Sequence, residues 1–456
     1  MPSKESDEAY AKRMLARADK VLESIDEAFI VTQRGHKLRD MPTFRPEEVS
    51  LGPLLGTGGF GIVNEIKKFT LDEDVTGQSK EADDDKADDS TDNNKENGTD
   101  NNAPPIEPTP SKDENHESMP SKEDNHDFHY DINRARRVMS SRVIRNGKGR
   151  YALKRLHDDL NTLEKARGMV DLAVEAKFLS IVWHPNIIKM RGMASGPMVD
   201  DYFFIILDRL VDTLDKRMNR WHAMHKKYNR GVMCGLMKNK RGLGELLLEA
   251  MTIAYDLAAA FFYLHENRLV YRDIKPENIG FDFRGDVKLF DFGLCKNLAP
   301  HLKAKEGGYG YRLTGRAGSL PYMAPEVAKM LTYDTKCDCF SFAILLWEML
   351  SCTPAFPDYS SLQYMDKVVT EQERLKVSKS WPPLTRLMIP EAWDDDPRKR
   401  PDMKRIAILI RGDLNDMTTD ERILHRTKHL AGRSQHSFNE ELIDAEDPQF
   451  AEKKEN

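Results

Sequence analysis

The chain has 456 residues, of which 39% are hydrophobic and 32% are charged. This length allows roughly two or three domains, but so polar a composition excludes packed core along the whole chain and predicts disordered segments. The net charge of −6 provides no general attraction for nucleic acid, so none is predicted as a partner.

The cysteines argue against a disulfide framework or a zinc site, because their number is odd and no CxxC pair is present. The longest apolar runs, such as residues 342–347, are far shorter than the roughly 20 residues of a membrane-spanning helix, so no membrane contact is predicted. The first residues are acidic and lack the apolar core of a signal peptide. We therefore expect a soluble protein of the cytoplasm or the nucleus. The sequence does not indicate its oligomeric state.

Apolar residues recur every three or four positions near the N-terminus, which predicts one face of a helix of about 20 residues. They are Tyr10, Met14, Ala18, Leu22 and Ile25. Such a face either packs on the following domain or docks a partner, and packing is the interpretation we favour. Residues 1–48 are assigned to this N-terminal helical extension.

Residues 49–67 predict two strands around a glycine-rich turn. The composition then changes abruptly, with nineteen acidic residues, five lysines and no arginine between Asp72 and Asp127. Such a segment cannot bury enough apolar surface to offset its loss of conformational entropy, so a disordered acidic insert is predicted at about 71–133. The arginine-rich run that follows would attract this acidic block. A localisation signal or an autoinhibitory contact is the alternative.

Further strands and helices follow the insert. Strands are predicted near 150–155, 187–193 and 202–207, and helices near 162–182, 245–265, 336–350 and 403–413. A basic block at 216–241, with nine Lys or Arg and no acidic residue, is interpreted as a solvated loop that could also dock a substrate. Residues 412–456 form a polar tail that is expected to be loosely ordered.

The glycine-rich turn contains Gly56, Gly58 and Gly61, followed by Val63. Glycines allow the backbone to approach phosphates without a Cβ in the way. A glycine pattern alone is a weak signal. This one lies between two predicted strands, which differs from the strand-to-helix turn of a dinucleotide site or a Walker loop. We interpret it as a lid over phosphates.

The most informative stretch is Tyr-Arg-Asp-Ile-Lys-Pro-Glu-Asn at residues 271–278, followed by Asp-Phe-Gly at 291–293. It supplies a carboxylate, a lysine and two oxygen ligands for a metal. Transfer of a phosphoryl group from ATP to a hydroxyl requires these parts. The stretch resembles the catalytic loop and the metal-binding motif of eukaryotic protein kinases. Lysine two residues after the aspartate is the arrangement of the serine/threonine type.

This resemblance covers about residues 49–411 and implies an α+β, bilobal protein-kinase-like fold. The N-lobe, about 49–207, would have a small antiparallel sheet and one main helix, and the C-lobe, about 211–411, would be mainly helical. ATP and Mg²⁺ would bind between them, and proteins would be the substrates. The resemblance implies the role of base for Asp273, of a cation on the transferred phosphoryl group for Lys275, and of metal ligands for Asn278 and Asp291.

The resemblance also implies that Ala152 lines the adenine pocket and that Lys154 contacts the phosphates of ATP. Lys154 then needs a carboxylate on the next helix, and Glu164 and Glu175 are the candidates. We choose Glu175, because it stands nine residues before the His-Pro-Asn stretch at 184–186, and we expect Glu164 to face solvent near the start of the helix.

For the hinge, the resemblance implies that Leu207 is the gatekeeper and that backbone groups near Asp208 and Leu210 bind adenine. Two positions depart from the family pattern. Tyr271 replaces the usual histidine. Gly280 stands where a leucine commonly forms the floor of the adenine pocket, and Ile279 or Phe281 is expected to compensate for the missing side chain.

The segment 291–326 resembles a kinase activation segment. In the family, the arginine before the base, here Arg272, commonly binds a phosphate on this segment, and Thr314 is our choice of phosphosite. Ser319 is expected to contact the base and the lysine. Arg400 is the expected ion-pair partner of Glu326, and Asp338 is expected to hold the backbone of the catalytic loop.

Three other functions fit parts of the sequence. A catalytically weak pseudokinase acting as a scaffold is disfavoured because Lys154, Asp273, Asn278 and Asp291 are all present. A kinase of small molecules or lipids would not need the full activation segment, which builds a platform for proteins. An interaction protein that works only through its acidic insert would not need the catalytic residues.

Overall fold

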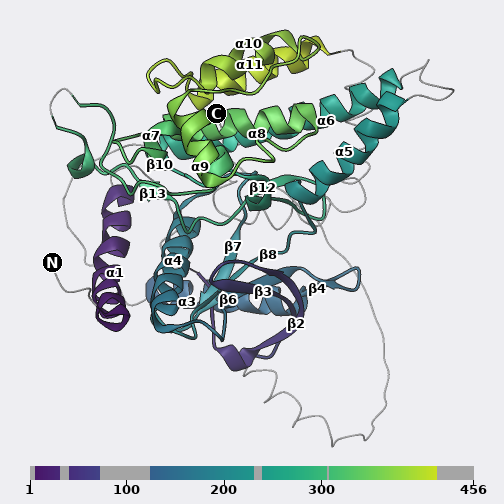
Figure 1. Ribbon diagram of the computed structural model, residues 1–456. Coiled ribbons are helices and arrows are strands. Elements are labelled where there is room, and N and C mark those ends of the chain that lie inside the picture. Colours follow the sequence, from purple (N-terminus) through teal and green to yellow (C-terminus); the bar gives the residue numbers. More distant parts are fainter. Residues whose placement is uncertain (1–5, 31–40, 72–123, 231–238, 306–307, 418–456) are drawn as a thin grey trace, which may run out of the picture.

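A computed structural model describes residues 6–30, 41–71, 124–230, 239–305 and 308–417, which form two lobes (Figure 1). The smaller lobe contains a sheet with helices beside it, and the larger lobe is mainly helical. The α+β bilobal arrangement predicted from the sequence is therefore confirmed. The predicted polar tail, residues 412–456, was wrong at its start, because residues 412–416 belong to helix α11 (Met403–Asp416); the residues after 417 lie outside the described part of the chain.

The N-lobe sheet has six strands in the order β1-β7-β8-β6-β3-β2. Neighbouring strands are antiparallel except β1 and β7, which are parallel. The strands are β1 (Thr43–Phe44), β2 (Val49–Thr57), β3 (Gly61–Phe69), β6 (Tyr151–Leu156), β7 (Met190–Ala194) and β8 (Phe204–Asp208). The short helix η2 (Pro46–Glu48) precedes β2. The glycine-rich turn joins β2 to β3 at one end of the sheet.

Helix α4 (Thr162–Ile181) is capped by Asn161, whose side chain accepts hydrogen bonds from the backbone N–H groups of Leu163 and Glu164. The Glu164 carboxylate bonds back to the Asn161 N–H, and this reciprocal cap fixes the start of the helix. Apolar residues lie on several faces of α4, so the helix needs packing partners on more than one side.

Helix α1 (Asp7–Ile30) is one of these partners and runs beside α4 (Figure 1). Ala11, Ala18, Leu22 and Ile25 are buried, whereas Tyr10 is 39% exposed. The predicted helix is present and packs on the N-lobe. Its buried stripe includes Ala11 instead of Tyr10, because a one-residue shift brings the small alanine to the helix contact.

Residues 72–123, most of the predicted disordered insert, lie outside the described residues. Helix α3 (Asp124–Ser141) begins inside the predicted range and leads to a hairpin of β4 (Ile144–Arg145) and β5 (Lys148–Gly149). Arg136 forms an ion pair of 2.7 Å with Glu48, and its guanidinium lies over the Phe44 ring. Such tertiary contacts stabilise a helix that the local composition does not signal.

The C-lobe consists mainly of α5 (Leu214–Arg230), α6 (Lys240–Glu266), α7 (Pro325–Ala328), α8 (Lys336–Ser351), α9 (Ser361–Gln363), α10 (Pro383–Ala392) and α11 (Met403–Asp416). A π-helical turn, η7 (Tyr364–Thr370), follows α9, and short 3₁₀ turns are η4 (Pro276–Asn278), η5 (Pro300–Leu302) and η6 (Leu320–Tyr322). Short strands are β9 (Asp212–Thr213), β10 (Leu269–Val270), β11 (Ile279–Phe281), β12 (Val287–Leu289) and β13 (Lys296–Asn297). Strands β12, β11 and β9 form a three-stranded sheet, in which β11 directly follows the stretch 271–278.

The interpretation of residues 216–241 as a solvated loop was wrong, because most of the block is helix α5. Apolar residues recur along α5 at a helical spacing among the basic ones: Leu214 and Trp221 are buried, and Met218, Met224 and Tyr228 pack against the core. Lys216, Lys226 and Lys227 are exposed, whereas Arg217 is half-buried and pairs with Glu249 of α6. Residues 231–238 lie outside the described part of the chain.

Helix α6 is long and apolar enough to cross a membrane by length and composition, which the lengths of the apolar runs in the sequence did not predict. Its apolar side chains are used in the C-lobe core: Met251, Ala254, Leu257 and Phe261 have no exposed surface. Core packing therefore accounts for the composition of this helix.

Candidate active site

Three charged side chains from distant parts of the chain meet between the lobes. The Nζ atom of Lys154, on β6, lies 2.6 Å from Oε2 of Glu175 and 3.2 Å from Oδ1 of Asp291. Glu175, on α4, is only 2% exposed. Of the two carboxylates considered from the sequence, Glu175 is the one in contact, whereas Glu164 caps the start of the helix.

The electrostatics of this group keep the lysine charged. Burial lowers the pKa of Lys154, but the carboxylates of Glu175 and Asp291 outweigh it and raise the pKa above its usual value. Lys154 in turn lowers the pKa of Asp291. Burial raises the pKa of Glu175 to about 6, although Lys154 opposes this shift. At neutral pH the group therefore consists of one cation between two carboxylates.

Hydrogen bonds surround the carboxylate of Asp273, a residue that is 7% exposed. Lys275 Nζ donates to Asp273 Oδ2 at 2.7 Å and to Ser319 Oγ at 3.1 Å. Ser319 Oγ donates to Asp273 Oδ1 at 3.0 Å, and Asn278 Nδ2 donates to Asp273 Oδ2 at 2.7 Å. The contact of Ser319 with both the aspartate and the lysine, expected from the resemblance, is present. These bonds hold the carboxylate in one orientation.

Asp338, on α8, fixes the backbone at the start of this loop. Its two carboxylate oxygens accept from the N–H groups of Tyr271 and Arg272, both at 2.9 Å. His265 also bonds to Asp338 Oδ2, at 2.9 Å, and the sequence reasoning did not find this histidine. Arg272 has a φ of +72°, an unfavourable backbone conformation for a residue with a side chain, so the anchoring by Asp338 offsets local strain.

Tyr271, in place of the usual histidine, is fully buried. Its hydroxyl donates to the carbonyl of Phe290, the residue before Asp291. Its ring lies edge-on to the ring of Phe292, with the centroids 5.4 Å apart. The tyrosine thus contacts the residues on both sides of Asp291 and holds that segment against the catalytic loop.

Asn278 and Asp291 offer the oxygen atoms that Mg²⁺ prefers. Asn278 donates through its Nδ2 atom, and its Oδ1 atom accepts no hydrogen bond from the described residues. The side chain of Asp291 is 43% exposed. The described residues contain no group of three or more His, Cys, Asp or Glu side chains that could hold a metal ion. The oxygens of Asn278 and Asp291 fit Mg²⁺, which keeps water and substrate phosphates among its ligands.

The glycine-rich turn is closed by a hydrogen bond from Gly58 N–H to Gly61 O at 2.7 Å. A Cβ on Gly56 would meet no atom within 4 Å, so contacts within the protein do not demand glycine there. Val63 pairs with the lysine of β6 across the sheet. The His157 ring lies 3.1 Å from Gly58 O and joins the turn to the end of β6, a contact that the sequence reasoning missed.

The predicted adenine site lies along β6 and β8. Ala152 is buried and pairs with Leu207 in the sheet. The Asp208 carboxylate accepts two hydrogen bonds from Arg191, of 2.8 and 3.0 Å, and the Asp208 backbone N–H donates to the carbonyl of Lys189 at 3.0 Å. Leu210 follows at the junction between the lobes.

Gly280 lies under the side chain of Leu210. A Cβ on Gly280 would come within 2.5 Å of Leu210 Cδ1 and 3.2 Å of Phe290 Cε1. Leu210 and Phe290 therefore occupy the space beside Gly280. Ile279 and Phe281 are both fully buried, and their expected compensation for the missing side chain stays a prediction.

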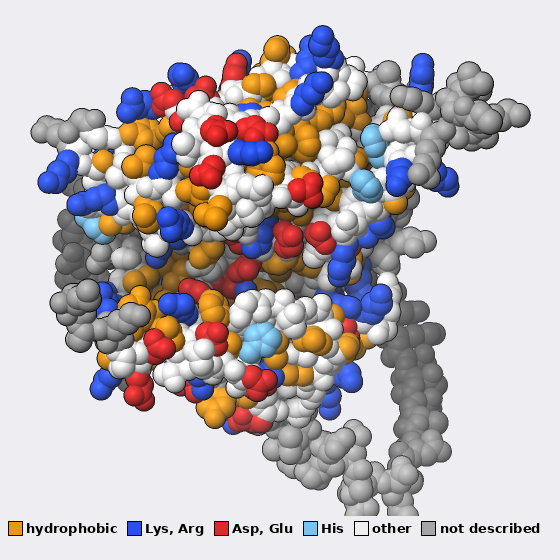
Figure 2. All heavy atoms as spheres, viewed as in Figure 1, with side chains coloured by type: hydrophobic (Ala, Val, Ile, Leu, Met, Phe, Trp, Pro, Cys, Tyr) orange, Lys and Arg blue, Asp and Glu red, His pale blue; other side chains and the backbone are white. Residues whose placement is uncertain are grey.

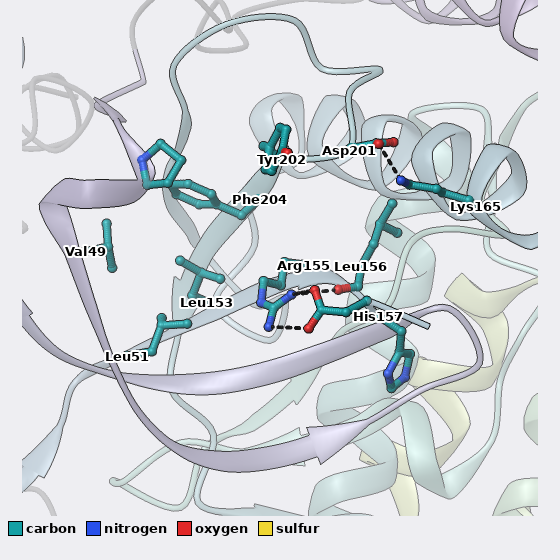
Figure 3. Close-up of a pocket in the computed structure, with 12 residues that line it drawn as sticks. Val49, Leu51, Leu153, Arg155, Leu156, His157, Lys165, Asp201, Tyr202 and Phe204 are labelled. Atoms are coloured by element: carbon teal, nitrogen blue, oxygen red, sulfur yellow. Dashed lines mark hydrogen bonds and ion pairs between the residues drawn. The ribbon is translucent and has the colours of Figure 1, made fainter. Parts of the chain in front are cut away.

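The surface is hollowed between the two lobes, and acidic side chains line part of the hollow (Figure 2). A second hollow, of about 440 Å³, lies in the N-lobe (Figure 3). It is on the opposite face of β6 from Ala152 and Lys154, since Leu153 lines it and side chains alternate along a strand. None of the predicted site residues lines this second hollow, so it is separate from the candidate active site.

The end of the activation segment is held by a buried ion pair. Arg400 donates to Glu326 through Nη1 at 2.7 Å and Nη2 at 2.8 Å. Both residues are at most 5% exposed. This is the pair expected from the sequence, and its two parallel bonds fix the segment to the C-lobe.

A comparison with protein families matches residues 138–408, more than half of the chain, to the protein kinase domain. The chain belongs to the protein kinase family. The N-terminal boundary of the match falls in α3, so the first strands of this kinase lie outside the matched range.

The names of similar curated proteins differ in the acceptor residues that they state. This kinase is 31% identical to the serine/threonine-protein kinase VIK of Arabidopsis thaliana over 253 residues, which are 55% of this chain and 50% of that protein. It is 34% identical to the dual specificity protein kinase shkB of Dictyostelium discoideum over 182 residues, 39% of this chain and 27% of that protein. The serine/threonine/tyrosine-protein kinase HT1 of Arabidopsis thaliana is 27% identical over 237 residues, 52% of this chain and 53% of that protein. The chain thus spans about half or less of the length of these relatives.

Proposed function

We propose that this protein kinase transfers the γ-phosphoryl group of ATP to serine or threonine hydroxyls of protein substrates, with Asp273 as the base. The observation that carries the proposal is the contact of Lys154 with both Glu175 and Asp291 beside a catalytic loop in which Asp273, Lys275 and Asn278 are already bonded together. A pseudokinase scaffold has no need of this convergence.

Each side chain has a task in this reaction. Lys154 is positioned by its carboxylate partners to bind the phosphates of ATP. The fixed carboxylate of Asp273 orients the substrate hydroxyl and takes its proton. Lys275 offsets negative charge on the transferred phosphoryl group. Mg²⁺, held by Asn278 and Asp291, would supply further charge neutralisation when bound.

The preference for serine and threonine rests on Lys275 and on its bonds to Asp273 and Ser319. The names of the relatives include dual-specificity kinases, so the acceptor needs its own test. Peptide libraries with Ser, Thr or Tyr as the single acceptor should give phosphorylation of the first two sets. Equal phosphorylation of the tyrosine set would replace our assignment with dual specificity.

Activity itself is tested with radiolabelled ATP, Mg²⁺ and a generic protein substrate. The wild type should transfer label, and Asp273→Ala should lose about 100-fold or more of the rate, because a positioned base contributes roughly 10²–10⁴. Exposed Asp201→Ala, in the N-lobe, is the matched control and should retain activity. A wild type no faster than Asp273→Ala would favour the pseudokinase alternative.

A further inference from the structure

Arg272 precedes the proposed base, and its guanidinium is surrounded by neutral acceptors. Nε donates to the carbonyl of Leu294 at 2.7 Å. Nη1 donates to the Tyr333 hydroxyl at 3.0 Å and to the Thr314 carbonyl at 3.5 Å. Within the described part of the chain, no carboxylate forms an ion pair with this guanidinium. The arginine is nevertheless only 7% exposed.

Tyr333 connects this arginine to the activation segment. The residue lies between α7 and α8 and has no exposed surface. Its hydroxyl accepts from Arg272 and donates to the Thr314 carbonyl at 2.6 Å. The hydroxyl, the guanidinium and the carbonyl thus form a closed set of three hydrogen bonds. The hydroxyl group of Tyr333 is therefore a neutral hydrogen-bond acceptor for Arg272.

The backbone of the same tyrosine holds the activation segment at a second point. Tyr311 N–H donates to Tyr333 O at 2.8 Å, and Tyr333 N–H donates to Tyr311 O at 3.1 Å. Gly310 has a φ of +72°, and a Cβ there would come within 2.7 Å of the Tyr333 backbone. Side chains are therefore excluded where the segment approaches Tyr333 most closely.

A second close approach joins the segment to Arg272. Gly318 has a φ of +95°, and a Cβ on it would overlap the Arg272 carbonyl oxygen. The next residue, Ser319, bonds to the Asp273 carboxylate at 3.0 Å. Hydrogen bonds and close backbone contacts therefore connect Tyr333, through Arg272 and residues 311–319, to the proposed base. Thr314 itself is exposed, and only its carbonyl takes part in these contacts.

We propose that Tyr333 is a positioning residue that docks the activation segment of this kinase on Arg272 without a phosphate on Thr314. The proposal rests on the proposed kinase function and specifies its regulation: catalysis requires the Tyr333 hydroxyl and does not require phosphorylated Thr314. This differs from the phosphosite role that the resemblance suggested for Thr314.

The test uses the full chain, treated with a phosphatase and shown by intact mass to carry no phosphate. Three variants are compared with it: Tyr333→Phe, Thr314→Ala and Tyr309→Phe. Tyr309 is the matched control, because it lies on the activation segment and its hydroxyl bonds to Asp334 and not to Arg272. Rates are measured at short times with a peptide acceptor, and kcat and KM are determined separately for peptide and ATP.

The unphosphorylated wild type and Thr314→Ala should both be active, with closely similar rates. Tyr333→Phe should lower kcat/KM for the peptide by about 10- to 100-fold, the effect expected for losing a hydrogen bond to a charged group, while the KM for ATP stays unchanged. Tyr309→Phe should cause a much smaller loss. A merely structural role for Tyr333 would lower the melting temperature and the affinities for both substrates together.

Two results would overturn the proposal: activity that appears only after phosphorylation of Thr314, or equal rates for Tyr333→Phe and Tyr309→Phe. If Tyr333→Phe does not fold, the rates of the unphosphorylated wild type and Thr314→Ala decide the matter alone. Failure of the kinase function itself is distinguishable, because the wild type would then match Asp273→Ala in every phosphorylation state.

Discussion

Lys154 and Arg272 are both cations of the active site, but the protein compensates their charges differently. Lys154 contacts two carboxylates, Glu175 and Asp291. Arg272 contacts a hydroxyl and two carbonyl oxygens. Charge therefore holds together the site proposed for the ATP phosphates, whereas hydrogen bonds to neutral groups dock the activation segment on Arg272. Removing a charge should harm the first region most, and removing a hydroxyl should harm the second.

The largest effect is expected for Lys154→Met. This variant removes a cation that faces the phosphates and leaves two carboxylates without their partner, so kcat/KM for ATP should fall about 100- to 1000-fold. Steady-state kinetics and thermal unfolding measure the two consequences. Lys165→Met is the control, because Lys165 on α4 is 40% exposed and its surface ion pair contributes little. Equal losses in the two variants would contradict the special role of Lys154.

A smaller effect is expected for Arg272→Met, because no carboxylate loses a partner. The hydroxyl of Tyr333 and the carbonyl oxygens lose a donor, which should cost about 1–3 kcal/mol of stability. The KM for ATP should stay near that of the wild type, while kcat/KM for a peptide falls. Thermal unfolding and kinetics for both substrates check this. Loss of ATP affinity as severe as in Lys154→Met would remove the distinction between the two cations.

The catalytic activity should depend on pH through Glu175, in the region around Lys154. The pKa of Glu175 is raised from 4.5 to about 6, so below pH 6 the carboxyl takes up a proton and its ion pair with Lys154 is lost. We expect kcat/KM for ATP to decline as the pH falls through about 6, and this step to be absent in Glu175→Gln. The stability contributed by this raised pKa is present below pH 4.5 and lost as the pH rises through about 6, so the decline in activity does not reflect unfolding by this group. An unchanged step in Glu175→Gln would assign it to another group.

The smallest effect on activity is expected at the contact of α1 with α4, which supports Glu175 indirectly. Leu22→Asp places a charge at a buried position and should lower stability by about 2–3 kcal/mol, with only a modest rise in the KM for ATP. Tyr10→Asp, at an exposed position on the same helix, is the control and should change neither quantity. Equal unfolding temperatures for the two variants would show that α1 does not depend on this contact.

The family resemblance grouped Asp273, Lys275 and Asn278 in one short stretch of sequence, and the structure adds the hydrogen bonds of Lys275 and Asn278 to Asp273. Glu175 was chosen because it stands nine residues before the His-Pro-Asn stretch at 184–186. The bonds of Arg272 to Tyr333 were not found, since residues 61 positions apart share no local pattern. The contact of Leu210 with Gly280 was missed for the same reason.

Secondary structure was missed where charge masked a weaker signal. The positive charges of α5 suggested a loop, although Leu214, Met218 and Trp221 followed a helical period. Helix α3 has no strong apolar stripe in its sequence and depends on contacts such as that of Arg136 with Glu48. Local composition cannot report such tertiary stabilisation.

We propose that Asp273 performs chemistry in a site that Lys154, Asn278 and Asp291 prepare for ATP and Mg²⁺. Nucleotide affinity and phosphoryl transfer should be measured together for the wild type and Asp273→Asn, which keeps the size of the side chain. We predict similar ATP affinity and a rate of transfer about 100-fold or more lower in the variant. Equal rates of transfer in the two proteins would contradict the account.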